Sequence, residues 1–228
     1  MTGFWTLTWL SARQLRGVAL LTLTLIAAYA VVVAGPRRLA DLYQSMAAFA
    51  SPMYVLPILF GAGVAAPLLA REQQRGTVDL AYTQSMPRGW WLTARILPTL
   101  GLAVLATLGV RAAFSVPPGN YLNAESGLSS LPGALAAVLF TCALGLCAGA
   151  VLGRVLPAVA VTVTGFLLTW TTGLRPLVEL FAPFPDGPSY YREEFERVGR
   201  VFVVVLLVLA GILLAATVGW MTRRVPRS

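Results

Sequence analysis

The side chains of this chain that could do chemistry are few, and the missing types limit the reactions it could catalyse. The sequence contains two cysteines, nine acidic residues, 17 basic residues that are all arginine, and no histidine. Without histidine there is no Ser-His hydrolytic pair, no imidazole metal ligand and no general base that titrates near neutral pH. Cys142 and Cys147 lie five residues apart, on different faces of a helix, so we expect small packing residues. The sequence therefore predicts no catalytic residue and no metal site.

The longest polar interval, residues 71–91, lies between two strongly apolar segments. Gly76 permits a sharp break in the backbone, and Thr77 can cap a new helix. Three side chains would share one face of that helix: Val78, Ala81 and Tyr82. The helix should end before Pro87, because the residue before a proline is disfavoured in the helical region. A helix of about two turns does not fold alone, so we expect a partner surface, either lipid headgroups or another protein.

The elements that must position this interval are membrane-spanning helices. The chain is 57% hydrophobic and only 11% charged, with a mean hydropathy of +0.76, whereas about a quarter of the residues of a soluble domain are charged. A spanning helix needs about 20 mainly apolar residues. Six stretches qualify: 17–34, 52–70, 91–114, 131–153, 155–173 and 198–221. We therefore predict an all-α membrane protein with six transmembrane helices, forming a single transmembrane domain over residues 1–228.

Three further elements complete the predicted architecture. Residues 1–16 carry two tryptophans and a basic side, which indicates an interfacial helix lying on the membrane. The fourth and fifth spans are almost continuous and require a tight turn at Gly153 and Arg154. Between the fifth and sixth spans, the apolar stretch 176–183 is too short to cross the membrane, so we expect a re-entrant or interfacial segment there.

The distribution of arginine predicts the orientation. With both termini in the cytoplasm, the cytoplasmic segments, including the 71–90 loop, hold ten arginines and two acidic residues, and the outer segments hold seven of each. Cytoplasmic loops of membrane proteins carry the excess of basic residues, so this bias favours cytoplasmic termini. The arginines flank apolar spans and form no stripe, so the net charge of +8 does not predict nucleic-acid binding.

Small residues and one arginine mark the spans themselves. Two spans have small residues at every fourth position: Gly145, Gly149 and Gly153 in the fourth, and Gly211, Ala215 and Gly219 in the sixth. Such a face permits close approach of another helix, from the same chain or from a second copy. Inside the second span, Pro57 and Pro67 together with Gly61 and Gly63 predict a kink. Arg111, near the outer end of the third span, could contact headgroups or an anionic substrate.

The polar interval also resembles a known family. The segment Arg71-Glu72-x-x-Arg75-Gly76-Thr77, followed by Leu80 and by Thr83-Gln84-Ser85-Met86-Pro87-Arg88-x-x-Trp91, is similar to the cytoplasmic loop of type 2 ABC exporter permeases. It is most similar in character to actinobacterial drug and peptide exporters. In that family the short helix after Gly-Thr is the coupling helix, which sits in a groove of a separate ATPase. The resemblance extends over the interfacial helix and the six spans. It departs where Leu80-Ala81-Tyr82 replaces the commoner Leu-Leu.

The resemblance implies partners and residue roles. The residues that it assigns to ATPase coupling are Glu72, Gly76, Thr77, Val78, Leu80, Ala81, Tyr82 and Thr83, with Arg154 as a smaller second contact. It implies two copies of the ATPase, which would use ATP and Mg, and a second permease copy that is identical or a sister chain. No cofactor would bind this chain directly. It also implies a bacterial cell membrane, surrounding lipids, and export of a hydrophobic or amphiphilic drug, peptide or lipid-like compound.

Two other classes of protein compete with this interpretation. An intramembrane enzyme would need a buried nucleophile and base or a pair of carboxylates, and the spans have no histidine and no acidic residue near their middle. A small-molecule-binding membrane subunit of an importer would also have about six spans, but it should not need a Glu…Gly-Thr coupling loop. A bulky substitution at Gly76 would separate the two, because only ATP-linked transport should fail.

Overall fold

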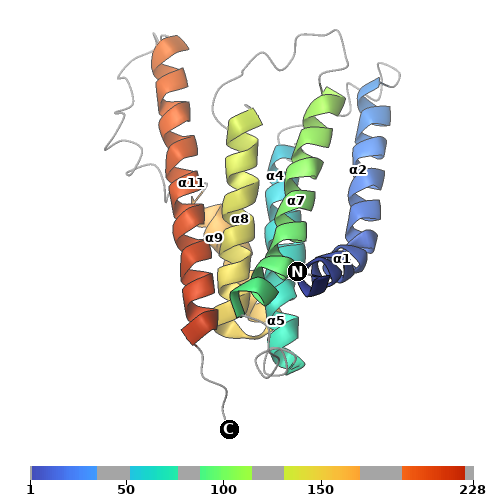
Figure 1. Ribbon diagram of the computed structural model, residues 1–228. Helices are drawn as coiled ribbons and strands as arrows, with labels where there is room; N and C mark the ends of the chain where they lie inside the picture. The colour runs from blue at the N-terminus through green and yellow to red at the C-terminus, as the bar shows by residue number, and fades with distance from the viewer. Residues whose placement is uncertain (1, 35–51, 77–87, 115–130, 170–191, 224–228) are drawn as a thin grey trace.

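Apolar composition produces a bundle of long helices in the computed structural model of the protein (Figure 1). The structure describes residues 2–34, 52–76, 88–114, 131–169 and 192–223, and these contain helices but no strand. The elements are α1 (Thr2–Gln14), α2 (Arg16–Ala34), α4 (Pro52–Ile58), η1 (Leu59–Ala65), α5 (Ala66–Gln74), α7 (Arg88–Phe114), α8 (Leu131–Leu152), α9 (Val155–Leu168) and α11 (Arg192–Arg223).

Four of the described helical segments are long and apolar enough to cross a membrane, which confirms the prediction of an all-helical membrane protein. They are Val55–Gln74, Gly89–Ala112, Leu131–Leu152 and Gly199–Arg223. The shorter apolar helix α9 and the helix α2 occupy the fifth and first predicted spans, so the count of six spans stays a prediction. The predicted re-entrant segment at 176–183 lies outside the described residues.

The centre of the bundle is formed by the second predicted span and α8. The helices α4, η1 and α5 follow one another without a break and pack along α8, and α7 packs beside both. Phe60, Leu69, Leu92 and Leu146 are fully buried between these helices and form the core. In Figure 1, α11 flanks α8 on one side and α2 flanks α7 on the other, so these two helices are peripheral.

The kink that prolines and glycines predict in the second span takes the form of a π-helical segment. In η1 the backbone turn is wider, because the N–H of Ala66 donates to the carbonyl oxygen of Gly61, five residues earlier. Pro67 follows directly and has no N–H to donate, so the regular hydrogen-bond ladder is also interrupted there. The wider segment places Gly61 against α8, where a Cβ atom would lie 2.6 Å from the carbonyl oxygen of Thr141.

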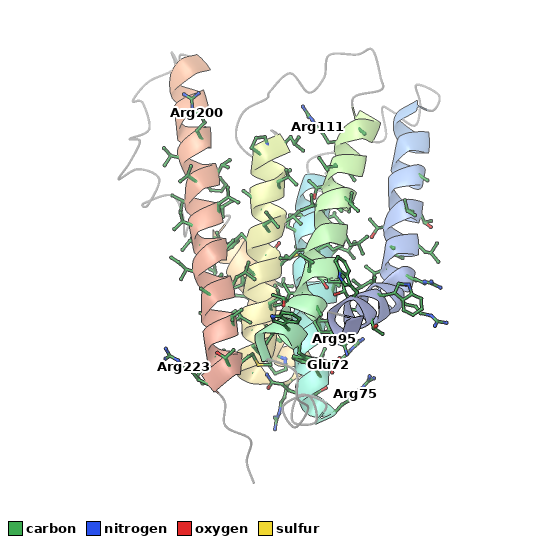
Figure 2. The ribbon with its side chains drawn as sticks, in the orientation of Figure 1. Glu72, Arg75, Arg95, Arg111, Arg200 and Arg223 are labelled. Atoms are coloured by element: carbon green, nitrogen blue, oxygen red, sulfur yellow. The ribbon has the colours of Figure 1, made fainter. Side chains whose placement is uncertain are left out.

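Charged side chains gather at the two ends of the bundle. Figure 2 places Glu72, Arg75, Arg95 and Arg223 toward one end, which we call the Glu72 end, and Arg111 and Arg200 toward the other, the Arg200 end. This distribution follows from the high cost of placing a charge in the hydrocarbon core of a membrane. The helix α1 lies across the bundle near the Glu72 end, where α11 also finishes (Figure 1).

Candidate functional site

The sequence places its most distinctive polar residues at the end of α5, and the structure joins this end to the neighbouring helices. Glu72 lies in the last turn of α5, and its Oε1 atom is 3.2 Å from Nη2 of Arg95 in α7. Both side chains are 16% exposed, so the ion pair is largely shielded from solvent. Removal of either partner would leave an uncompensated and largely shielded charge, which costs more than the loss of an exposed pair.

Arg95 was not among the functional residues predicted from the sequence, although its position inside a predicted span marks it as unusual. Arg95 lies inside the third predicted span, close to its start, and a charge in such a position needs a partner or a route to the headgroups. The partner that the structure supplies is the carboxylate that ends the preceding span. Pairing of charges at facing ends of consecutive spans could therefore have been proposed.

Gln73, the next residue, connects α5 to two more helices. Its Nε2 atom donates a hydrogen bond of 2.6 Å to the carbonyl oxygen of Ala150 near the end of α8. The same atom lies 3.6 Å from Sδ of Met221 in α11. Glu72 and Gln73 together link the end of α5 to α7, α8 and α11, and we call these two residues the α5 clamp.

Gly153 lies in the turn from α8 to α9, next to the side-chain amide of Gln73. Its φ angle is +61°, in the left-handed region that favours glycine. A Cβ atom there would lie 2.6 Å from Oε1 of Gln73, so the absence of a side chain also makes room for the clamp. The next residue, Arg154, is exposed and directly precedes the first turn of α9.

Gly76 ends the helix that carries the α5 clamp. Its φ angle is +67°, and its N–H donates to the carbonyl oxygen of Gln73 at 3.2 Å. A left-handed glycine after the last turn is a common way to stop a helix, and it turns the chain toward residue 77. The other residues assigned to coupling, Thr77, Val78, Leu80, Ala81, Tyr82 and Thr83, lie outside the described residues.

The glycines of α8 lie against the second predicted span of the same chain. A Cβ atom on Gly145 would overlap the carbonyl oxygen of Gly61, and one on Gly149 would lie 2.5 Å from that of Ala66. Close approach of two helix backbones needs such side-chain-free positions. The second predicted span is therefore packed closely on α8 between Gly61 and Ala70.

Comparison with known families decides the class of this chain. A family model described as ABC-2 membrane transporter related matches residues 34–175, which is more than half of the chain and includes the α5 clamp, Gly76 and the α8–α9 turn. The chain belongs to the ABC-2 membrane transporter related family. No curated protein and no solved structure matches it. It is a membrane permease component of an ABC transporter, and the family partners with an ATPase subunit. The resemblance stated from the coupling loop is thereby confirmed at the level of the family.

The remaining candidate residues of this ABC-2 permease lie apart from the clamp. Arg111 in α7 is half-buried and lies at the Arg200 end of the bundle, opposite to Glu72 (Figure 2). Cys142 is buried and Cys147 is half-buried in α8, and both are free thiols. Within the described ranges, no three His, Cys, Asp or Glu side chains come together as a metal site.

The clamp can be tested with two adjacent glutamines. We expect Gln73→Ala to lower the free energy of unfolding by about 1–3 kcal/mol, because the carbonyl of Ala150 loses its side-chain partner. Gln74→Ala is the matched control, since Gln74 is exposed, and we expect a change within about 0.5 kcal/mol. Thermal unfolding of the two detergent-purified variants measures the difference. Equal stability of both variants would contradict a clamping role for Gln73.

Proposed function

We propose that this chain is the membrane-spanning permease subunit of an ATP-driven exporter and that the Glu72 end of the bundle receives the ATPase. The observation that carries the proposal is the α5 clamp. Two consecutive side chains bind the end of α5 to α7, α8 and α11, and Gly76 then turns the chain into the loop that the family resemblance assigns to coupling. In this proposal the bundle has six spans and both termini are cytoplasmic.

The clamp explains how movement of the coupling loop reaches the membrane. When the ATPase displaces residues 77–85, the force acts on the end of α5 and on the start of α7, the two helices that the loop joins. The ion pair to Arg95 makes α5 and α7 move together, and the amide of Gln73 passes the force to α8 and α11. The backbone contacts at Gly145 and Gly149 make α8 follow the second span closely. The bundle then moves as a packed unit against a second permease copy, which is identical or a sister chain.

The cargo in this proposal is hydrophobic or amphiphilic, as for the drug and peptide exporters of actinobacteria. Buried polar side chains in the described spans are mostly threonines, and their hydroxyls donate to carbonyl oxygens of their own helices. Examples are Thr107, Thr141, Thr162 and Thr217, with donor–acceptor distances of 2.7 to 2.9 Å. Hydroxyls satisfied in this way offer little to a polar substrate. ATP and Mg are bound by the partner ATPase, with no cofactor on this chain.

The test of the proposal is purification of the tagged chain from a bacterial host that carries its natural partner genes, in mild detergent. Co-purifying chains are identified by mass spectrometry, and native mass measurement gives the stoichiometry. We expect two ATPase copies and two permease chains in one complex, retained when ATP hydrolysis is blocked. A complex with a bound small molecule and no ATPase would support an importer's binding subunit instead.

Substitution of Gly76 tests whether its backbone geometry matters for coupling. We expect Gly76→Val to lower ATP-linked transport at least tenfold, because a β-branched residue resists the left-handed conformation. No other atom lies within 4 Å of a Cβ placed there, so the effect comes from φ and not from a clash. Gly76→Asn should retain most activity, since asparagine tolerates this region.

Gly89→Ala, at a position with open space and no positive φ angle, serves as the control and should behave like the unchanged protein. Transport is measured in vesicles with the co-purified ATPase. Equal activity of Gly76→Val and Gly76→Asn would show that the left-handed turn has no part in coupling.

A further inference from the structure

We propose that the exposed face of α1 binds the headgroups of anionic phospholipids at the Glu72 end of the bundle. Trp5 and Trp9 are one helical turn apart and are 70% and 56% exposed. Arg13 follows one turn after Trp9, Arg16 is the first residue of α2, and both side chains are exposed. We call these four residues the α1 face. Amphipathic aromatic rings and basic side chains are the types that settle at the headgroup level of a membrane.

The arginine nearest to the tryptophans is already positioned for an anion. The Cζ atom of Arg13 lies 5.6 Å from the centroid of the Trp9 ring, which is cation–π distance. The ring holds the guanidinium group in place without neutralising its charge. In the part of the chain that the structure describes, no carboxylate lies within ion-pair distance of Arg13 or Arg16. A phosphate group would supply the missing negative charge, and an arginine can bind it through two N–H groups.

The rest of the protein fixes the direction of the α1 face. The helix packs on α7 through its other side, where Ser11 is only 4% exposed and Leu15 contacts the main core. Trp5, Trp9 and Arg13 therefore lie on the side of α1 away from this contact, and Arg16 is exposed at the start of α2. The first 40 residues of the chain contain no acidic side chain, so nothing nearby in sequence offsets the positive charge.

The surroundings of the α1 face favour a lipid over a soluble anionic partner. The first turns of α2 continue directly from α1 and expose large apolar side chains, with Leu20 65% and Leu23 62% exposed. A phospholipid can place its phosphate at the arginines, its interfacial region at the tryptophans and its acyl chains along these leucines. Because α2 occupies a predicted span, these leucines face acyl chains, and the arginines just before them lie at the depth of the lipid phosphates and not in bulk water.

The experiment titrates the purified full-length chain with phosphatidylglycerol or phosphatidylcholine and measures bound lipid by native mass spectrometry. We expect the unchanged chain to bind phosphatidylglycerol more tightly than phosphatidylcholine. The double variant Arg13→Gln/Arg16→Gln should weaken phosphatidylglycerol binding at least tenfold, because each basic residue near an anionic surface contributes about fivefold in affinity. Its binding of phosphatidylcholine should be unchanged, and Arg13→Lys/Arg16→Lys should retain most of the preference.

The control is Arg71→Gln/Arg75→Gln, which removes the same charge from two exposed arginines, one in the last turn of α5 and one directly after it, at the same end of the bundle. It should keep the phosphatidylglycerol preference, and excess inorganic phosphate should not compete. Thermal unfolding of each variant confirms that it is folded. The proposal is overturned if the α1-face variant keeps the full preference, if the control loses as much, or if inorganic phosphate displaces the lipid. These readouts involve no transport, so they are independent of the proposed function.

Discussion

Replacement of Gly145 by valine is expected to prevent accumulation of the folded permease. The Cβ atom alone would overlap the carbonyl oxygen of Gly61 and would approach the backbone nitrogen of Ala66 to 3.0 Å. Both neighbouring groups are backbone atoms of a packed helix, so they cannot move aside as a flexible side chain could. Overpacking of a tight core costs about 1–3 kcal/mol, and we expect valine to exceed this range here. Gly145→Ala should fall within it.

The matched control for Gly145 is a glycine with open space around it. Gly211 in α11 has no atom within 4 Å of an added Cβ, so Gly211→Val should change stability by less than about 1 kcal/mol. Thermal unfolding and size-exclusion profiles of the detergent-extracted variants give the comparison. Equal stability of Gly145→Val and Gly211→Val would contradict the close packing of α8 on the second span at Gly145.

Neutralisation of either partner of the Glu72–Arg95 pair is expected to uncouple ATP hydrolysis from transport. Each single variant, Glu72→Gln or Arg95→Gln, leaves one largely shielded charge without its partner. The cost should be about 2–3 kcal/mol, slightly below that of a fully buried pair because the side chains retain some exposure. We expect transport to fall at least tenfold while the ATPase still binds, because α5 and α7, the two helices that the coupling loop joins, would no longer be held together by the ion pair.

A double-mutant cycle isolates the interaction of the two residues. Glu72→Gln/Arg95→Gln should be less damaging than the sum of the single variants, with a coupling free energy of about 1–3 kcal/mol. Arg71→Gln removes an exposed charge one residue before Glu72 and should leave transport near its original level. If the effects of Glu72→Gln and Arg95→Gln simply add, the ion pair does not couple α5 to α7, whatever the effect of each variant alone.

Features that depend on local backbone chemistry could be predicted from the sequence. Length and apolarity placed the helices, and Gly76 and Gly153, both expected at sharp breaks, have left-handed φ angles. Helix ends were less predictable. The sixth predicted span begins at 198, whereas the helix α11 that contains it begins at Arg192, because the charged residues before the apolar span continue the same helix. A hydropathy pattern marks the membrane boundary of such a helix and not its first turn.

Features that depend on contacts between distant residues could not be predicted. Gln73 and Ala150 are 77 positions apart, and no local pattern relates them. The small-residue runs of the fourth and sixth spans look alike, yet Gly145 touches a neighbouring backbone while Gly211 and Gly219 have open space. In a membrane the lipid-facing and protein-facing sides of a helix are both apolar, so the pattern alone does not show which glycines are packed.

The most direct test of the account is whether the Glu72 end of the bundle faces the ATPase. A photo-crosslinking amino acid is placed at Arg75 in one variant and at Arg200 in another, two exposed positions at opposite ends of the bundle (Figure 2). The complex is purified with its ATPase, illuminated and analysed by mass. We predict a covalent permease–ATPase product from position 75 and none from position 200. A product from position 200, or none from position 75 in an intact complex, would contradict the account.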